Sequence, residues 1–327
     1  MRRILLGVAG LLLLVALAAA GLVGWIGLGL GGALPGPGTV TQQALPADAV
    51  AARLQTRRNA ARRLGGQDAD ATQILFGDLH VHTTFSSDAY LFSLPIVQGE
   101  GAHPPADACD FARFCAELDF WSINDHAELL SPRQWSETVE SVRECNRAAG
   151  DPANPDLVSF VGWEWTDMSP DAANHYGHKN VVVRGIEPGE VPARPVAARS
   201  TVIDQAVRGM GAIGGTLLAL GDLGSPGPYL DFNRYRREVS GLQRCSPSDA
   251  ADAACSQVAE TPAELFARLD QLEADTLVIP HGLSWGIHAP MLSRLDNQIS
   301  QHDPERERLY EVYSGHGSSE TSRARET

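Results

Sequence analysis

Residues Gly77 to Asp88 read GDLHVHTTFSSD and follow a short apolar run, Ile74-Leu75-Phe76, that predicts a strand. Residues two apart in a strand point the same way, so His80 and His82 can hold one ion together. A lone His-x-His pair is weak evidence for a metal site. The rest of the chain therefore decides whether this pair belongs to a larger cluster.

Strands and helices alternate along the chain after this segment. We predict strands at 118–123, 157–163, 179–184, 276–279 and 309–313, and helices at 106–117, 131–149, 201–210 and 261–273. The second helix opens with Ser131-Pro132, a typical N-cap followed by proline at the first helical position. Such alternation is typical of an α/β fold with a mostly parallel sheet.

Side chains that bind metals fall at the ends of these predicted strands. They are Asp88, the pair Asp125-His126, Glu164, His175, His178 and His281. Taken alone, each of these residues could have an ordinary role: an N-cap of a helix, a carboxylate at the rim of a site, or a histidine hydrogen-bonded to a backbone carbonyl. Five such sites at five strand ends favour an active site, because α/β folds assemble their sites there. Imidazole with carboxylate suits Zn²⁺, Mn²⁺ or Fe²⁺ better than Ca²⁺.

These segments resemble the motifs of the polymerase and histidinol phosphatase (PHP) superfamily. GDLHVHTTFSSD resembles its first motif, LDFWSINDH (118–126) its second, GWE (162–164) its third and IPHG (279–282) its later histidine motif. The resemblance covers about residues 74–320. It looks closest to an uncharacterised branch of exported PHP-like bacterial proteins that forms a domain of unknown function, through DAYLF (88–92), INDHAE (123–128) and EVYSGHGSSE (311–320).

The resemblance implies a distorted seven-stranded α/β barrel with two or three divalent ions. The ligands it implies are His80 and His82 for one ion, Asp88 and His126 for a second, Glu164 as a bridge between two, and His281 with His178 or His175 for a third. Asp88 stands where some members carry His, so this site should be less selective for zinc. The superfamily's late Asp-x-His is missing after His281, among residues that include His288, His302 and His316. We therefore expect a domain that is incomplete at its C-terminus, or else one that is degenerate.

The expected activity is phosphoester hydrolysis with divalent ions that activate water. The chain has no G-x-S-x-G nucleophile elbow, and Ser86 and Ser87 are interpreted as groups that support the ligands or bond backbone.

Lys179 is the single lysine and follows His178. It is either an accident of composition or a contact to a phosphoryl oxygen. A metal-dependent amidohydrolase and a membrane-anchored binding or scaffold protein are the alternative functions. Residues 90–108 and 221–255 are expected to shape the pocket for a small-molecule or phosphoester substrate.

The N-terminal segment is apolar: Ile4 to Leu34 carry no charge and exceed the roughly 20 residues that cross a bilayer. Arg2 and Arg3 precede it, which predicts a cytoplasmic N-terminus and an extracytoplasmic domain. We expect an anchor or signal peptide at 1–34, a linker at 35–72 and the hydrolase domain at 73–327. An anchor places the domain at the bacterial inner membrane, facing the periplasm; cleavage after 18–20 would release it as a secreted protein.

The net charge and the cysteines bear on two further questions, nucleic-acid binding and disulfide formation. Acidic residues outnumber basic ones 40 to 26, and this net charge of −14 argues against general nucleic-acid binding. Export would permit disulfides, and Cys245 with Cys255 is the favoured pair. Cys109 and Cys115 lie six residues apart in a predicted helix, which fits disulfide geometry poorly. The five cysteines leave at least one thiol free.

Overall fold

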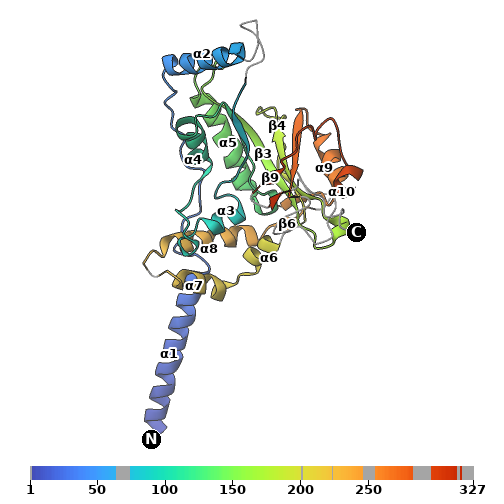
Figure 1. The fold of residues 1–327 in the computed structure, drawn as a ribbon. Helices are drawn as coiled ribbons and strands as arrows, with labels where there is room; N and C mark the ends of the chain where they lie inside the picture. Colours follow the sequence, from blue (N-terminus) through green and yellow to red (C-terminus); the bar gives the residue numbers. More distant parts are fainter. Residues whose placement is uncertain are drawn as a thin grey trace.

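The structure is a computed structural model that describes residues 2–63, 74–199, 202–222, 224–245, 255–282, 296–314 and 317–318. His288 and His316, considered above, lie outside these residues. The fold is a mixed α/β arrangement in which helices cover a curled sheet (Figure 1). A long helix, α1 (Arg2–Gly27), projects from one end, and α2 (Ala47–Arg63) lies at the other.

The main sheet contains β1 (Gly77–Val81), β2 (Phe120–Ile123), β3 (Val158–Asp167), β4 (Gly177–Val183) and β8 (Thr276–His281), in the order β1-β2-β3-β4-β8. The first three strands are parallel to one another. The sheet curls into about half a barrel, and the described residues do not confirm the expected barrel of seven strands.

Strand β4 departs from the expected parallel pattern, because it runs antiparallel to both β3 and β8. Only nine residues separate Asp167 from Gly177, whereas a parallel crossover needs about a dozen or more. The chain therefore turns straight back, through the short turn η4 (Ala172–Asn174). As a result, the beginning of β4 lies beside the ends of β3 and β8, and His178 pairs with His281 across the sheet.

Helices α4 (Pro105–Asp110), α5 (Pro132–Ala148) and α9 (Pro262–Leu269) pack on the sheet around three fully buried tryptophans, Trp121, Trp163 and Trp165. Ser131 caps the start of α5, as the sequence predicts, and it also forms a capping box with Gln134. The helix expected at 106–117 is instead α4 followed by a π-turn, η2 (Phe111–Cys115). This brings Cys109 to Cys145, a disulfide that the sequence analysis missed.

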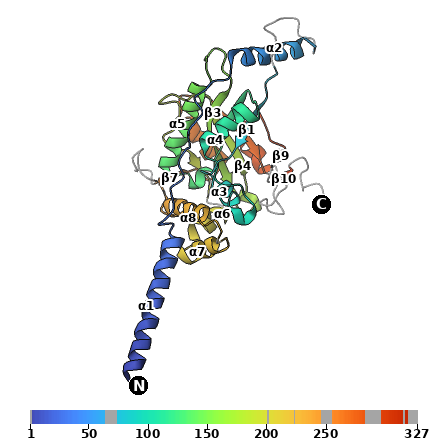
Figure 2. The same ribbon diagram turned by 90° about the vertical axis from the view of Figure 1, so that its left-hand side faces the viewer.

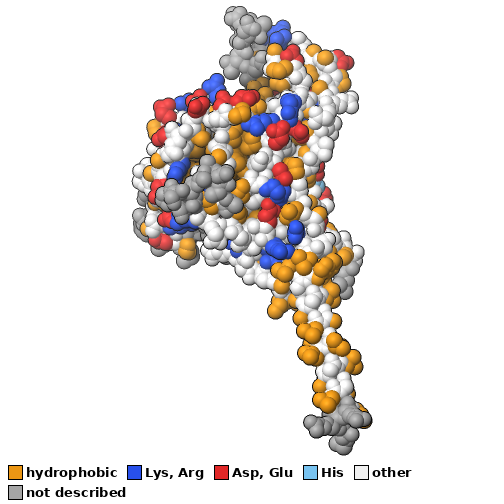
Figure 3. All heavy atoms as spheres, turned by 180° about the vertical axis from the view of Figure 1, so that it is seen from behind, with side chains coloured by type: hydrophobic (Ala, Val, Ile, Leu, Met, Phe, Trp, Pro, Cys, Tyr) orange, Lys and Arg blue, Asp and Glu red, His pale blue; other side chains and the backbone are white. Residues whose placement is uncertain are grey.

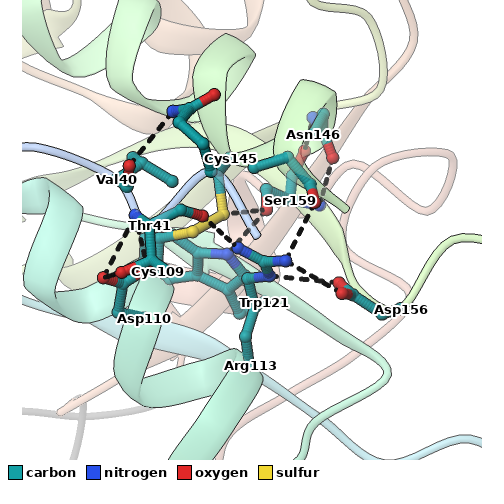
Figure 4. The surroundings of a disulfide bond; sticks show 12 residues. Val40, Thr41, Cys109, Asp110, Arg113, Trp121, Cys145, Asn146, Asp156 and Ser159 are labelled. Atoms are coloured by element: carbon teal, nitrogen blue, oxygen red, sulfur yellow. Dashed lines mark hydrogen bonds and ion pairs between the residues drawn. A yellow bond between two sulfur atoms is a disulfide. The ribbon is translucent and has the colours of Figure 1, made fainter. Parts of the chain in front are cut away.

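The expected linker is partly packed against the domain. Val40 is buried in the main core, and the buried guanidinium of Arg113 donates to the carbonyls of Thr41 and Gln43 at 2.8 and 3.0 Å. The same guanidinium pairs with Asp156, at 2.9 Å (Figure 4). Residues 35–46 are thus tied beside the disulfide rather than free of the domain.

A second helical group forms the end from which α1 leaves. It comprises α3 (Ser87–Phe92), η1 (Pro95–Val97), α6 (Val202–Gly209), α7 (Ala212–Leu220) and α8 (Gly227–Ser240). These elements pack around Tyr90, Tyr229, Phe232 and Tyr235. Much of the expected pocket loop at 221–255 is therefore helix α8. Figure 2 shows α7 and α8 beside the end of α1.

The remaining strands are short. β5 (Val196–Ala197), β7 (Cys255–Val258) and β6 (Gln243–Arg244) form a parallel sheet, and the predicted Cys245–Cys255 disulfide is confirmed beside it. β9 (Tyr313–Ser314) pairs with β10 (Gly317–Ser318). The expected strand 309–313 is thus largely absent, since its residues instead run beside β8, where Glu311 N–H donates to Pro280 at 3.0 Å. Two further short helices are η3 (Ala127–Leu129) and α10 (Asp296–Ser300).

Candidate metal centre

Seven side chains predicted as ligands converge at one end of the sheet. They are His80, His82, Asp88, His126, Glu164, His178 and His281. Strands β1, β3 and β8 supply residues near their C-terminal ends. The reversed strand β4 supplies His178 near its N-terminal end, which lies at the same edge. The carboxylate of Glu164 is fully buried at the centre of the group.

His80, His82 and Glu164 form the first cluster. The two Nε2 atoms lie 3.1 Å apart, and they lie 3.3 and 3.0 Å from Glu164 Oε2. Two nitrogen ligands at zinc distances of about 2.0–2.1 Å and a tetrahedral angle lie about 3.3 Å apart. The three atoms therefore have the spacing of ligands around one cation.

Asp88 and His126 form the second cluster together with His82. His126 Nε2 lies 3.1 Å from Asp88 Oδ2. The backbone N–H of His126 donates to Ser86 Oγ at 2.9 Å, and the same hydroxyl lies 3.0 Å from His82 Nδ1. Ser86 is fully buried. It therefore joins two ligands that follow β1 and β2, in keeping with its interpretation as a supporting group.

Glu164 reaches a third set of histidines through its other oxygen, Oε1. This oxygen lies 3.3 Å from His281 Nε2 and is bonded by His178 Nδ1. His175, the alternative to His178, instead places its Nδ1 3.2 Å from the carbonyl oxygen of Ser169. The structure therefore brings His178, rather than His175, into the centre, and the two oxygens of Glu164 face different clusters.

Glu311 is a candidate ligand that the sequence analysis missed. Its Oε2 lies 2.8 Å from His80 Nδ1 and 3.9 Å from His281 Nδ1, and the three residues form a cluster of their own. The late ligand motif expected in this region was Asp-x-His. The segment Glu311-Val312-Tyr313 does not match that motif, so Glu311 was not predicted as a ligand. Its position inside the strand predicted at 309–313 was the available signal.

The protonation of the metal-free cluster follows from the mixture of charges. Burial opposes ionisation of Glu164, but His126, His281 and His178 hold its pKa well below the usual value. Burial likewise disfavours the charged form of His80, yet Glu164 and Glu311 raise its pKa to about 10. In the metal-free cluster, protons on the histidines balance the charge of the carboxylates. Metal ions must displace these protons in order to bind.

Two buried groups behind the ligands hold them in place. Thr166 Oγ1 donates to Glu164 Oε1 at 3.0 Å and lies 2.6 Å from His126 Nδ1. Glu128 accepts from the backbone N–H groups of Thr166 and Ala198, at 3.0 and 2.7 Å. Burial, together with Asp204, raises the pKa of Glu128 to about 8. Such partners fix the orientation of metal ligands.

Lys179 lies on the opposite face of β4 from His178 and is fully buried. Its ammonium donates to Glu307 at 3.0 Å, and burial lowers its pKa to about 8 despite this partner. The hypothesis that Lys179 contacts a phosphoryl oxygen is therefore replaced by a structural role. Alternate residues of a strand face opposite sides of the sheet, which separates it from the ligands.

Among the described residues, the candidate ligands differ in their exposure to solvent. The side chains of His80, His82, Asp88 and Glu311 are 18–26% exposed, whereas those of Glu164 and His281 are at 0%. A separate hollow lies among the described residues, lined by Leu75, Phe120, Val158 and Leu277 near the starts of the strands. None of the predicted ligands lines this hollow.

Comparison with known proteins supplies one finding. A protein-family model described as "Protein of unknown function (DUF3604)" matches residues 69–133, which are 65 of the 327 residues. The matched region holds His80, His82, Asp88 and His126 and ends before Glu164. No curated protein and no solved structure matches the chain.

Proposed function

We propose that this protein is a metal-dependent hydrolase that cleaves phosphoesters and has a PHP-like centre of two or three divalent ions. The observation that carries the proposal is the position of Glu164: one buried carboxylate whose two oxygens face five histidines at the edge of the sheet. A structural metal site needs only one closed set of four ligands. Overlapping clusters with an exposed side favour a multinuclear centre that admits a substrate.

The residues of the chain have distinct parts in this proposal. His80 and His82 with Glu164, and Asp88 with His126, would hold two ions; His178, His281 and Glu311 would complete the set. When bound, clustered divalent ions lower the pKa of water and offset the charge that develops on a phosphoryl group. The partly exposed ligands form the side from which substrate would enter, and Thr166 and Ser86 would hold the ligands in position.

The choice of ion follows from the donor set. Five imidazoles with carboxylates suit Zn²⁺, Mn²⁺ and Fe²⁺. Asp88 supplies a carboxylate where some PHP members carry His, so this position favours a harder ion such as Mn²⁺ more than a histidine would. The same ligands would serve an amidohydrolase equally well, and only a substrate screen separates the two reactions.

The test uses the full chain loaded separately with Mn²⁺, Zn²⁺ or Fe²⁺ and assayed on generic phosphomonoesters, phosphodiesters and amides. We expect metal-dependent cleavage of a phosphoester that a chelator abolishes. Cleavage of amides alone would replace the phosphoesterase by an amidohydrolase. Bound metal without turnover on any of these substrates would favour the binding or scaffold function, and absence of bound metal would overturn the proposal.

A further inference from the structure

Helix α7 presents an apolar face that no described part of the chain covers. Ile213, Leu217 and Leu220 are 70, 65 and 49% exposed and are spaced four and three residues apart, along one side of the helix. The other side of α7 packs inward through buried Thr216 and Ala219. The apolar face of this helix therefore points outward, the reverse of an ordinary surface helix.

This face continues onto a neighbouring segment. Ile96 and Val97 of η1 are each 49% exposed, and Phe92 at the end of α3 is 61% exposed. A Cβ placed on Gly221, directly after α7, would lie 2.8 Å from Ile96 Cδ1, so the two segments touch. Neither 91–99 nor 209–221 contains a charged residue. A contiguous exposed apolar patch of this kind marks an interaction surface.

Through α7, the patch adjoins the point where α1 leaves the rest of the molecule. Thr216 of α7 donates to the carbonyl of Val23 at 2.9 Å, and Arg236 of α8 donates to that of Gly27 at 2.6 Å. Helix α1 contains 22 residues, Leu6–Gly27, long and apolar enough to cross a membrane. Figure 3 shows hydrophobic side chains along α1 and on the adjoining end of the molecule.

We propose that α7, η1 and the end of α3 form a membrane-contact face: Ile213, Leu217, Leu220, Ile96, Val97 and Phe92 lie in the interfacial layer of the bilayer that α1 enters. The occupant is a lipid surface because the patch is continuous with a helix of membrane length and is fixed to it by hydrogen bonds. An outward apolar face beside such a helix is covered when its side chains enter the lipid boundary.

The contact would also position the metal centre. Asp88 and Phe92 stand at the two ends of α3, four residues apart, which is about 6 Å along a helix axis. Ser87 of the same helix donates to Asp204 of α6 at 3.1 Å, so α3 is held to the helical group. The candidate centre would therefore stay close to the membrane surface instead of moving freely on a tether.

The test measures lipid contact at single residues of the full chain. With Cys115 changed to Ser, we would replace Ile213, Leu217 or, as a matched control, Ile299 by Cys and attach an environment-sensitive fluorophore. Ile299 lies on α10, away from α7, and is 70% exposed, as Ile213 is. A fourth label at Leu14 reports whether α1 is in the bilayer. The protein is placed in vesicles of neutral lipid without a quencher, with a lipid that quenches from the headgroup region, or with a lipid that quenches from the middle of its acyl chain, which is the depth of position 14.

We expect a severalfold greater loss of fluorescence at 213 and 217 than at 299. Quenching at 14 with equal, weak quenching at 213, 217 and 299 would overturn the membrane-contact face while leaving α1 in the bilayer. Absence of quenching at all four positions would overturn both. Neither result depends on hydrolysis, so the outcome is independent of the proposed activity.

Discussion

At the scale of single residues, Glu164 is the group on which the centre depends. Its carboxylate is fully buried among histidines that come from β1, β4 and β8 and from the segment after β2. A buried carboxylate of this kind is costly unless cations or protonated partners balance it. The histidines provide that balance in the metal-free protein, and divalent ions would provide it in the loaded one.

Glu164→Gln should remove the negative charge and keep the shape. We expect bound metal to fall and hydrolysis to drop by more than roughly 100-fold, because loss of a ligand exceeds loss of a supporting partner. Glu140→Gln on the exposed side of α5 is the matched control. Elemental analysis measures the metal, and circular dichroism checks the fold. Unchanged metal occupancy in Glu164→Gln would remove this residue from the ligand set.

Thr166→Val tests the layer behind the ligands. The hydroxyl joins His126 Nδ1 to Glu164 Oε1, which directs His126 Nε2 toward Asp88. Valine has the same size but makes neither bond. We expect metal affinity to fall by about 10–100-fold, measured by competition with a chromophoric chelator. An affinity equal to that of the parent protein would show that packing alone orients His126.

Metal binding should also depend on pH in a defined direction. The pKa of His80 is raised to about 10 in the metal-free protein, so below that pH metal must displace its proton. Raising the pH toward 10 should therefore tighten binding by about tenfold per pH unit for each proton displaced. Calorimetry in buffers of different ionisation enthalpy near pH 7 should show net proton release. Zero release would mean that His80 is already neutral.

At the scale of elements, the direction of β4 decides which residues meet. His178 joins the centre because β4 turns back after β3, and Lys179 is directed to the opposite face for the same reason. The sequence places both residues near the start of a predicted strand, but the alternation of strands and helices predicted a mostly parallel sheet. A turn of nine residues was the physical sign of reversal, since it is too short for a crossover helix.

Lys179→Met should destabilise the fold without affecting the metal. The variant removes the ammonium group from the buried carboxylate of Glu307, which keeps Gln298 and His302 as partners, so we expect a loss of about 1–3 kcal/mol. The double variant with Glu307→Gln should regain most of that loss, since the charge is then gone. Urea denaturation measures the free energy of unfolding. A marked loss of turnover in Lys179→Met at full stability and full metal content would return Lys179 to the active site.

At the scale of the whole molecule, the sequence was informative where chemistry is local. His80 and His82 alternate along one predicted strand, and His126, Glu164 and His281 each lie at the end of an apolar run, so their convergence was predictable. The Cys109–Cys145 disulfide depends on how α4 packs on α5, 36 residues apart in sequence, and nothing local indicates it. Helix α8 has an uneven apolar pattern because it packs against α1, α6 and α7 instead of lying on a sheet.

The location of the domain can be tested with the cysteines themselves. Four of the five form disulfides, and Cys115 is free and exposed. We assume cells whose outer membrane has been permeabilised while the inner membrane stays intact. If α1 holds the domain outside the cytoplasm, a maleimide that cannot cross the inner membrane should label Cys115 alone in such cells. Cys115→Ser should remain unlabelled. A domain in the reducing cytoplasm would react only after lysis, and would then expose additional thiols, because disulfides rarely persist there. That pattern would reverse the predicted orientation and place the membrane-contact face on the inner leaflet.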